Sequence, residues 1–374
     1  MKIQIRQAVR ITALQMLMLS TLCLAVSLAA VAQSSAPSAD PEHEGITIGL
    51  LVTENPDENR LMQEALDAVH LAVSGANRDG GLRGNQVQIV VRSVDGHWGA
   101  GSKEAVDLIT NHNAKALLGF LDGRSAHLVE QVCTKAEIPF ISAISPDPTL
   151  SRINIPWFFS MMPDAETQAG AIADHIFRDG SDKSISVITS DDYDQGFTSR
   201  YFLEEASRRS GRPAIDLSYP SGPEEFNQLS EQLSAANSDA IVFFGRSGEL
   251  EKLLRNPGFT EHSTPLYTPI MNVESDLFAN EGIPIFTLRP EGLDSEKKTA
   301  FRGQFFTEYG YRPGSYASYI FDGTHALLEA MKMNGHGNHR LQAALREMET
   351  NGIHGAISFD SDGMIRQQPG VVQV

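Results

Sequence analysis

Cysteine is nearly absent from this chain of 374 residues, which contains only Cys23 and Cys133. Two cysteines cannot build a disulfide framework or a four-thiolate metal site. Cys133 lies in the stretch LVEQVCTKAEIPF, and we interpret it as a small buried residue and not as a catalytic thiol.

Long apolar runs are absent after residue 32. Three basic residues precede residues 11–32, which are almost wholly apolar or small and end in Ala-Val-Ala. This pattern predicts a secretory signal peptide over residues 1–32 that is cleaved after Ala32. A retained membrane anchor is the alternative. A lipoprotein is disfavoured, because Cys23 follows Leu22 and not a small residue.

Positive charge is scarce: 30 Lys and Arg residues stand against 47 Asp and Glu residues, a net charge of −17. Removing the three N-terminal cations leaves 27 against 47, a net charge of −20. So acidic a chain should repel nucleic acid and anionic lipid. We expect a soluble protein exported to the periplasm, without a nucleic-acid partner. One remaining cysteine allows no intrachain disulfide.

Catalytic motifs are missing too. No glycine loop ends in G-K-[ST], and neither GRSAH nor GRSG is the G-x-S-x-G elbow of hydrolases. HGNH at 336–339 could contribute to a metal site, but a surface loop is favoured because such a site needs three or four ligands. The sequence therefore predicts a protein that is not an enzyme and has no metal or cofactor.

What the sequence does contain is an alternation of short apolar runs with helical patterns. A helix capped near Asn55 ends at Gly80-Gly81, where a left-handed cap favours glycine. The other elements of this first run are predicted strands at 46–52, 86–93, 116–120 and 139–142, and predicted helices at 103–111 and 126–136. Such alternation predicts a parallel sheet with helices on both faces.

A second run of the same kind follows. Its predicted helices are 164–177, 195–210, 224–235 and 249–255, and its predicted strands are 184–189, 215–219, 240–244 and 266–268. The remainder is predicted as a strand at 285–288, helices at 296–309, 318–333 and 340–350, and two strands around the turn 360–363. The fold class is thus α/β, with two doubly wound parallel-sheet lobes.

Five stretches, in order along the chain, carry a family resemblance. They are GANRDGGLRGNQVQIVVRSVDG (75–96), AEIPFISAISPDPTLS (136–151), DDYDQGF (191–197), SDAIVFFGRSGELEKLLR (238–255) and IHGAISFDSDG (353–363). Together they resemble the periplasmic leucine/isoleucine/valine-binding protein family, the type I solute-binding proteins of ABC importers. In that family the third stretch reads D-x-x-YG-x-G.

The resemblance implies two lobes joined by three crossings near Pro163, Arg289 and Gly352. A flexible leader would cover residues 33–44. Lobe 1 would then comprise residues 45–163 plus 289–351, and lobe 2 residues 164–288 plus 352–374.

Ligands bind outside the carboxyl ends of parallel strands, so the glycines at 80–84 are scaffold. The resemblance places the ligand in the loops that follow the strands. The implied ligand-binding residues are Trp98, Asp122, Gly123, Arg124, Ser142, Ile144, Ser145, Tyr193, Arg246, Met271 and Tyr316. Among these, Tyr193 matches a stacking tyrosine, and Trp98 is a candidate platform.

One departure bears on the ligand. Near Met271 the acidic residue that pairs with a ligand ammonium is missing, and a buried ammonium needs such a partner. Arg246 instead offers a fork of donors suited to a carboxylate. Glu54, Asp122 or Asp191 could replace the missing acid. An amino acid and an anionic organic or aromatic acid therefore both remain candidate ligands.

The resemblance implies a monomeric extracytoplasmic protein that closes about its hinge on an amino acid or related small carboxylate. It would deliver this ligand to membrane ABC permease subunits. The alternative is a ligand-sensing module for a membrane receptor or kinase. A third hypothesis, an exported hydrolase, requires a nucleophile–base pair between the lobes.

Overall fold

The computed structural model describes residues 45–53, 59–94, 99–152, 155–209, 211–222, 226–260, 263–270 and 282–374. The predicted signal peptide, its cleavage residue Ala32 and the predicted leader lie outside these ranges. Within them, every helix is too short or too polar to span a bilayer.

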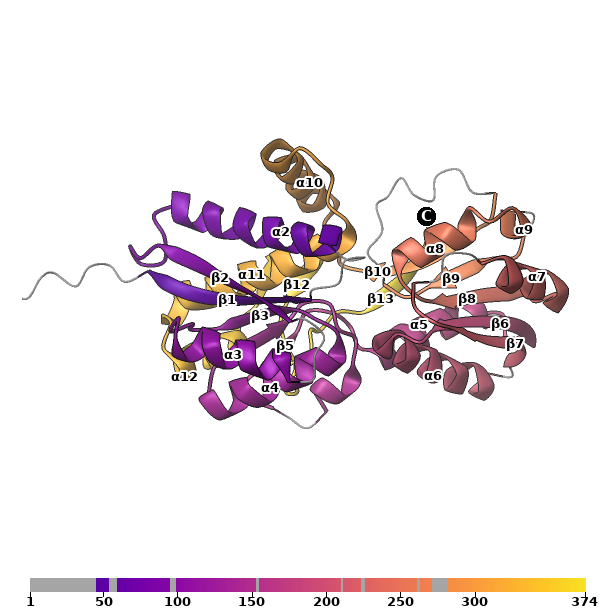
Figure 1. Cartoon of the computed structure of the whole chain (residues 1–374), viewed down its shortest axis with the longest axis horizontal. Coiled ribbons are helices and arrows are strands. Elements are labelled where there is room, and N and C mark those ends of the chain that lie inside the picture. Colours follow the sequence, from indigo (N-terminus) through magenta and orange to yellow (C-terminus); the bar gives the residue numbers. More distant parts are fainter. Residues whose placement is uncertain are drawn as a thin grey trace, which may run out of the picture. The chain divides into compact units, whose positions relative to one another are not determined.

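The first sheet has five parallel strands in the order β2-β1-β3-β4-β5. Their bounds are Ile46–Thr53 (β1), Val87–Val94 (β2), Leu117–Phe120 (β3), Phe140–Ser142 (β4) and Phe158–Ser160 (β5). Helices α2 (Asn59–Arg78) and α11 (Ser315–Asn334) pack on one face, and α3 (Ala100–Thr110) and α4 (Gly123–Ala136) on the other (Figure 1). We refer to this sheet and its helices as lobe 1.

The second sheet has six strands in the order β13-β10-β9-β8-β6-β7, with only β13 antiparallel to its neighbour. Their bounds are Lys183–Ser190 (β6), Gly211–Tyr219 (β7), Ala240–Phe244 (β8), Leu266–Thr268 (β9), Ile285–Pro290 (β10) and Pro369–Gln373 (β13). Around it lie α5 (Ala165–Ile176), α6 (Tyr193–Arg208), α7 (Asn227–Ala236), α8 (Ser247–Leu254) and α9 (Pro257–Thr260) (Figure 1). We refer to this sheet and its helices as lobe 2.

These two sheets confirm the predicted fold class. Strand β8 is buried at every residue, as expected for a parallel strand covered on both faces. The remaining elements are a short 3-10 helix η2 (Pro148–Leu150), α10 (Ser295–Tyr309), α12 (Asn338–Glu347) and a small hairpin of β11 (Thr350–Gly352) with β12 (Gly355–Ile357). The residue boundaries predicted for the two lobes stay a prediction.

Several predicted elements differ from the observed ones. Strand β5 was missed because its three residues adjoin the predicted first crossing. Strand β7 begins four residues early, since an edge strand tolerates Pro213. Helix α12 ends at Glu347, and Thr350 belongs to β11, not to a helix. Directly around the predicted turn, Phe359 and Ile365 form an antiparallel bridge, whereas β12 and β13 farther from the turn pair with β11 and β10.

The joint between α2 and β2 has the predicted geometry. Gly80 and Gly81 have φ values of 99° and 74°, in the left-handed region that favours glycine. A Cβ on Gly81 would lie 2.3 Å from the carbonyl oxygen of Asn85. This joint lies at the amino ends of the strands, so it positions the sheet and leaves the carboxyl ends free for a site.

We predict that Gly81→Ala lowers the free energy of unfolding by at least about 1–2 kcal/mol, the cost of the left-handed backbone for a residue with a Cβ. Urea unfolding measures this change in the free energy of unfolding. The matched control is Gly75→Ala inside α2, where a Cβ meets nothing within 4 Å and alanine should be neutral or stabilising. Equal effects of the two changes would contradict the role given to Gly81.

Candidate functional site

The carboxyl ends of the strands in both lobes lead into helices whose first turns lie close together. In lobe 1, Asp122 follows β3 and caps α4, where its Oδ1 accepts from the Ser125 amide at 2.9 Å. In lobe 2, Asp192 follows β6 and caps α6, where its Oδ1 accepts from the Asp194 amide at 3.0 Å. Both helices begin two or three residues before their predicted starts because these aspartates cap them.

The lobes are joined at this point by hydrogen bonds to Asp194. The backbone N–H of Gly123 donates to both carboxylate oxygens of Asp194, at 3.1 and 3.2 Å. The Ser145 hydroxyl, from the loop after β4, donates to the same carboxylate at 3.4 Å. Asp194 is 8% exposed, so this contact is largely closed to water.

The electrostatic environment of Asp194 disfavours its charge. Burial raises its pKa well above the usual range, and the neighbouring carboxylates of Asp192, Asp122 and Asp147 raise it further. The hydrogen bond from the Gly123 amide acts in the opposite direction and lowers the pKa. A buried carboxyl surrounded by like charges binds its proton more tightly than in the unfolded chain.

Asp147 is the second buried acid of the site. Burial pushes its pKa up, but hydrogen bonds from His127 and Thr149 outweigh that effect and leave the pKa below its usual range. The Thr149 amide and hydroxyl donate to Oδ1, and the His127 ring lies 3.3 Å from Oδ2. Asp147 and Asp194 pack so closely on Gly123 that a Cβ there would lie 2.6 and 2.7 Å from their oxygens.

Tyr193, the candidate stacking tyrosine, lies beside this contact. Its ring packs edge-on against Phe197, and the Arg124 guanidinium of lobe 1 lies 5.3 Å from the ring centre. Burial, together with the charge of Asp147, raises the pKa of Tyr193 to about 12, so the phenol stays protonated at neutral pH.

Arg246 is already paired. Its guanidinium donates to Asp192 Oδ2 at 3.1 Å, while its backbone N–H donates to Glu249 at 2.8 Å. Glu249 is buried and also accepts from Tyr219 and Gly222. This network holds the side chain of Arg246 at the same edge of lobe 2 as Asp192.

Three other predicted residues lie near this edge. The Tyr316 hydroxyl, from α11, donates to the Ile270 carbonyl after β9 at 3.3 Å. Ser142 ends β4, and its buried hydroxyl has no hydrogen-bond partner in the described part of the chain. Ile144 is half-buried and packs against the core.

The structure thus brings Asp122, Gly123, Arg124, Ser145 and Tyr193 together at one contact. Trp98, Met271 and the proposed replacement acid Glu54 lie outside the described residues. Another proposed replacement, Asp191, is exposed and accepts hydrogen bonds from the amide and hydroxyl of Ser221 within lobe 2.

Sequence reasoning missed Asp194, which joins the lobes through Gly123 and Ser145. A signal was present. When Tyr193 is aligned with the tyrosine of the D-x-x-YG-x-G pattern, Asp194 replaces the first glycine of that pattern. The family pattern has a glycine at this position, so the charged side chain of Asp194 is a feature in which this chain differs from the family.

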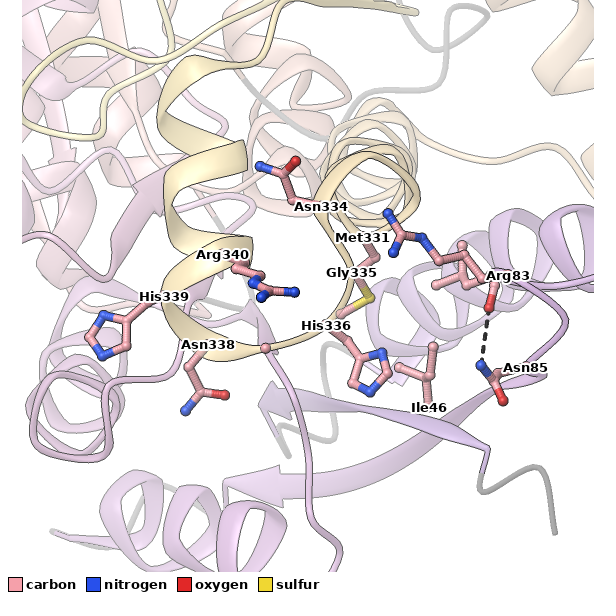
Figure 2. A pocket seen from close by; sticks show the side chains of 12 residues that line it. Ile46, Arg83, Asn85, Met331, Asn334, Gly335, His336, Asn338, His339 and Arg340 are labelled. Carbon is pink, nitrogen blue, oxygen red and sulfur yellow. Dashed lines mark hydrogen bonds between the residues drawn. The ribbon is translucent and has the colours of Figure 1, made fainter. Parts of the chain in front are cut away.

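A separate cavity of about 450 Å³ lies at the opposite end of lobe 1, beside Ile46 at the start of β1. Figure 2 shows Arg83, His336 and Arg340 around it, together with the HGNH loop. His339 of that loop pairs with Glu137 at 3.1 Å. Across the described residues, no three His, Cys, Asp or Glu side chains are arranged to hold a metal ion.

We predict that Asp194→Asn raises the melting temperature more at pH 8 than at pH 4. A carboxyl whose folded-state pKa is raised contributes stability below its unfolded pKa of about 3.9 and loses that contribution as the pH rises through the folded value. Asparagine keeps an acceptor for the Gly123 amide and does not titrate. Melting temperatures of the wild type and of Asp194→Asn, measured from pH 4 to pH 8, test this prediction.

Asp191→Asn is the matched control on the same loop, because hydrogen bonds from Ser221 lower the pKa of Asp191. The sign is therefore opposite: Asp191 contributes stability above its unfolded pKa, and its replacement should cost more at pH 8 than at pH 3. If Asp194→Asn shows the pH dependence of Asp191→Asn, the raised pKa of Asp194 is wrong.

Known proteins resemble this chain in sequence and in fold. The sequence profile described as periplasmic binding protein matches residues 45–374. Glutamate receptor 1.1 of Arabidopsis thaliana is 26% identical over 217 residues, which are 58% of this chain and 26% of the receptor. The chain therefore spans about a quarter of the length of that curated relative.

Two solved structures are similar in fold. The substrate-binding protein LivJ of Streptococcus pneumoniae, in complex with isoleucine, has a TM-score of 0.74 at 19% identity and covers 88% of this chain and 100% of its own. A solute-binding protein of an ABC transporter from Rhodopseudomonas palustris, in complex with 3,4-dihydroxybenzoic acid, has a TM-score of 0.77 at 19% identity, with 88% and 93% covered. At such identities the likeness establishes the fold, and with the profile match it shows that the chain belongs to the periplasmic binding protein family.

Proposed function

We propose that this protein is the solute-binding component of an ABC importer, and that it captures an amino acid or a related small carboxylate between its lobes. One observation carries the proposal: the carboxyl ends of two parallel sheets meet at hydrogen-bond distance, through Gly123 and Asp194. Ligands of open α/β sheets bind at that edge. The structural relatives named above carry isoleucine and 3,4-dihydroxybenzoic acid, and both are small carboxylates.

The residues at the contact suit a carboxylate. In lobe 1 the donors are the Gly123 amide at the start of α4 and the Ser145 hydroxyl, with the Ser142 hydroxyl at the end of β4, which has no hydrogen-bond partner among the described residues. A helix N-terminus adds a favourable field for an anion. In lobe 2, Arg246 offers its charge, and Tyr193 a ring face. Ligand bound to one lobe would recruit the other, and the closed form is favoured by the ligand's extra contacts there.

We further propose that binding involves no covalent chemistry. One arrangement resembles a hydrolase triad: His354 lies 3.1 Å from the Ser318 hydroxyl and 2.9 Å from Asp322. However, all three residues are buried, and the Ser318 hydroxyl donates to the Ser315 carbonyl. Asp322 also accepts from the Ile353 and His354 amides, so the cluster fastens the segment after β11 to α11.

The proposal includes export. The N-terminal pattern predicts a signal peptide cleaved after Ala32 and delivery to the periplasm, where a monomer would present its ligand to membrane permease subunits.

A second candidate function is ligand sensing for a membrane receptor, and the match to plant glutamate receptors favours it. The two functions share the ligand site and differ in the partner. Reconstituted permease subunits would import ligand only with a transport component, whereas a sensing module would leave import unchanged.

We predict that a small carboxylate stabilises the protein in a thermal-shift screen, because a ligand of the native state raises stability by RT ln(1 + [L]/Kd). A panel of branched-chain and acidic amino acids, benzoate, 3,4-dihydroxybenzoate and dicarboxylates tests it, with calorimetry to measure Kd and chromatography to show that the ligand returns unchanged. A ligand that is converted to product, or a panel without any binder, would contradict the proposed function.

We predict that Arg246→Ala weakens binding of a carboxylate found in that screen by about 1.5–3 kcal/mol, the worth of a hydrogen bond to a charged group. Arg246→Lys should recover only part of this binding free energy, since lysine lacks the forked donors of the guanidinium group. Arg200→Ala is the control: that guanidinium lies over the Phe197 ring on the same helix as Tyr193, and its loss should leave Kd nearly unchanged. An unchanged Kd for Arg246→Ala removes Arg246 from the site.

A further inference from the structure

The carboxylate at the start of α4 belongs to the protein itself. Asp194, from lobe 2, places both oxygens on the Gly123 amide of lobe 1 and one of them on the Ser145 hydroxyl. These are the donors that the proposed function assigns to the carboxylate of a ligand. An aspartate side chain and a small carboxylic acid present the same group to such donors, so they compete for one position.

Hydrogen bonding within lobe 2 does not explain the position of the Asp194 side chain. Helix α6 is capped by Asp192, which satisfies the amides of Asp194 and Gln195, so the helix does not need a second acidic cap. In the described residues, every hydrogen bond that the Asp194 carboxylate accepts comes from lobe 1. The side chain therefore contributes its bonds to the contact between lobes and not to the fold of lobe 2.

Neighbouring carboxyls make the contact between Asp194 and lobe 1 costly in free energy. The contact can therefore open reversibly. The charged and titratable groups that face it from neighbouring elements are Asp122, Arg124 and His127 on α4, Asp147 after β4, Asp192 and Tyr193 on α6, and Arg246 before α8. Four carboxyls share this space, and Arg124 and Arg246 each already lie beside one of them. Like charges in a buried site repel, so the bonds to Gly123 and Ser145 hold against an opposing force.

We propose that Asp194 is an intramolecular clasp: in the absence of ligand it occupies the carboxylate position of lobe 1 and holds the two lobes together, and a carboxylate ligand must displace it. The claim that a ligand displaces Asp194 rests on the proposed function. The claim that Asp194 holds the lobes together concerns the ligand-free protein alone.

A clasp of this kind weakens the apparent affinity for every ligand by the same factor. If the binding-competent, unclasped form makes up a fraction f of the protein, the apparent Kd equals the intrinsic Kd divided by f. A clasp that is shut about nine-tenths of the time would weaken apparent affinity about tenfold. Ligands that make contacts beyond their carboxylate overcome this, whereas acetate and similar fragments do not.

Small-angle scattering of the ligand-free protein tests the clasp. The protein is first stripped of bound solute by unfolding in urea and refolding. Asp194→Ala removes the acceptor and should increase the radius of gyration above that of the wild type. Asp194→Asn keeps an oxygen for the Gly123 amide and should scatter as the wild type does. Asp191→Ala, on the same loop but bonded within lobe 2, should also leave the scattering unchanged.

Gly123→Ala provides an independent variant from the other lobe, because its Cβ would lie 2.7 Å from Asp194 Oδ1. It should expand the ligand-free protein as Asp194→Ala does, so the test does not depend on one variant folding. Scattering identical to the wild type for both folded variants would overturn the clasp, as would equal expansion in Asp191→Ala.

Calorimetry with isoleucine and with benzoate tests the displacement. For a probe that binds the wild type, Asp194→Ala should lower the apparent Kd about three- to tenfold, the range for a clasp shut about 70–90% of the time. A Kd that is unchanged or raised overturns displacement. If neither probe binds any variant, the proposed function fails for these carboxylates, while the scattering still decides the clasp.

Discussion

The bond between the Gly123 amide and the Asp194 carboxylate links the two sheets at the edge where parallel strands offer their ligand-binding loops. A carboxylate that leaves water must be matched by donors or neutralised. Here the first amide of α4 and a serine hydroxyl provide the match, while three neighbouring carboxyls oppose it. The balance between these terms, together with the hydrogen bond from Tyr316 to Ile270, contributes to how tightly the lobes are held.

This balance connects packing to recognition. Gly123 has no side chain, and only a glycine lets two carboxylates approach the start of α4 so closely. Because the same amide and hydroxyl suit an incoming carboxylate, the proposed function assigns lobe contact and ligand capture to one set of donors. Proteins that close on a ligand gain from contacts made only in the closed form, and the bond between Gly123 and Asp194 is such a contact between lobes.

Much of the fold could be predicted from the sequence, since strong apolar runs such as β1 and β8 and the glycine cap of α2 are local signals. The failures have local causes as well. Strand β5 has only three residues, and β7 runs through a proline that an edge tolerates. Strand β13 pairs with β10, which is distant in the sequence, and no local pattern specifies that partner.

The sequence predicts which loops lie together but not the contacts between them, and ligand binding by these loops stays a prediction. Asp122, Gly123, Ser145 and Tyr193 were expected and lie together, but the pairing of Arg246 with Asp192 depends on two loops some fifty residues apart. Asp194 was visible only as a departure from a pattern. Its partner lies 71 residues away, so its role follows from tertiary structure alone.

The most direct measurement of the central claim is a crystal structure of the protein with a carboxylate ligand identified by calorimetry. We expect the ligand carboxylate to accept the Gly123 amide between the lobes, with Asp194 turned away from α4. A ligand bound elsewhere, while Asp194 still accepts from Gly123, would contradict the account.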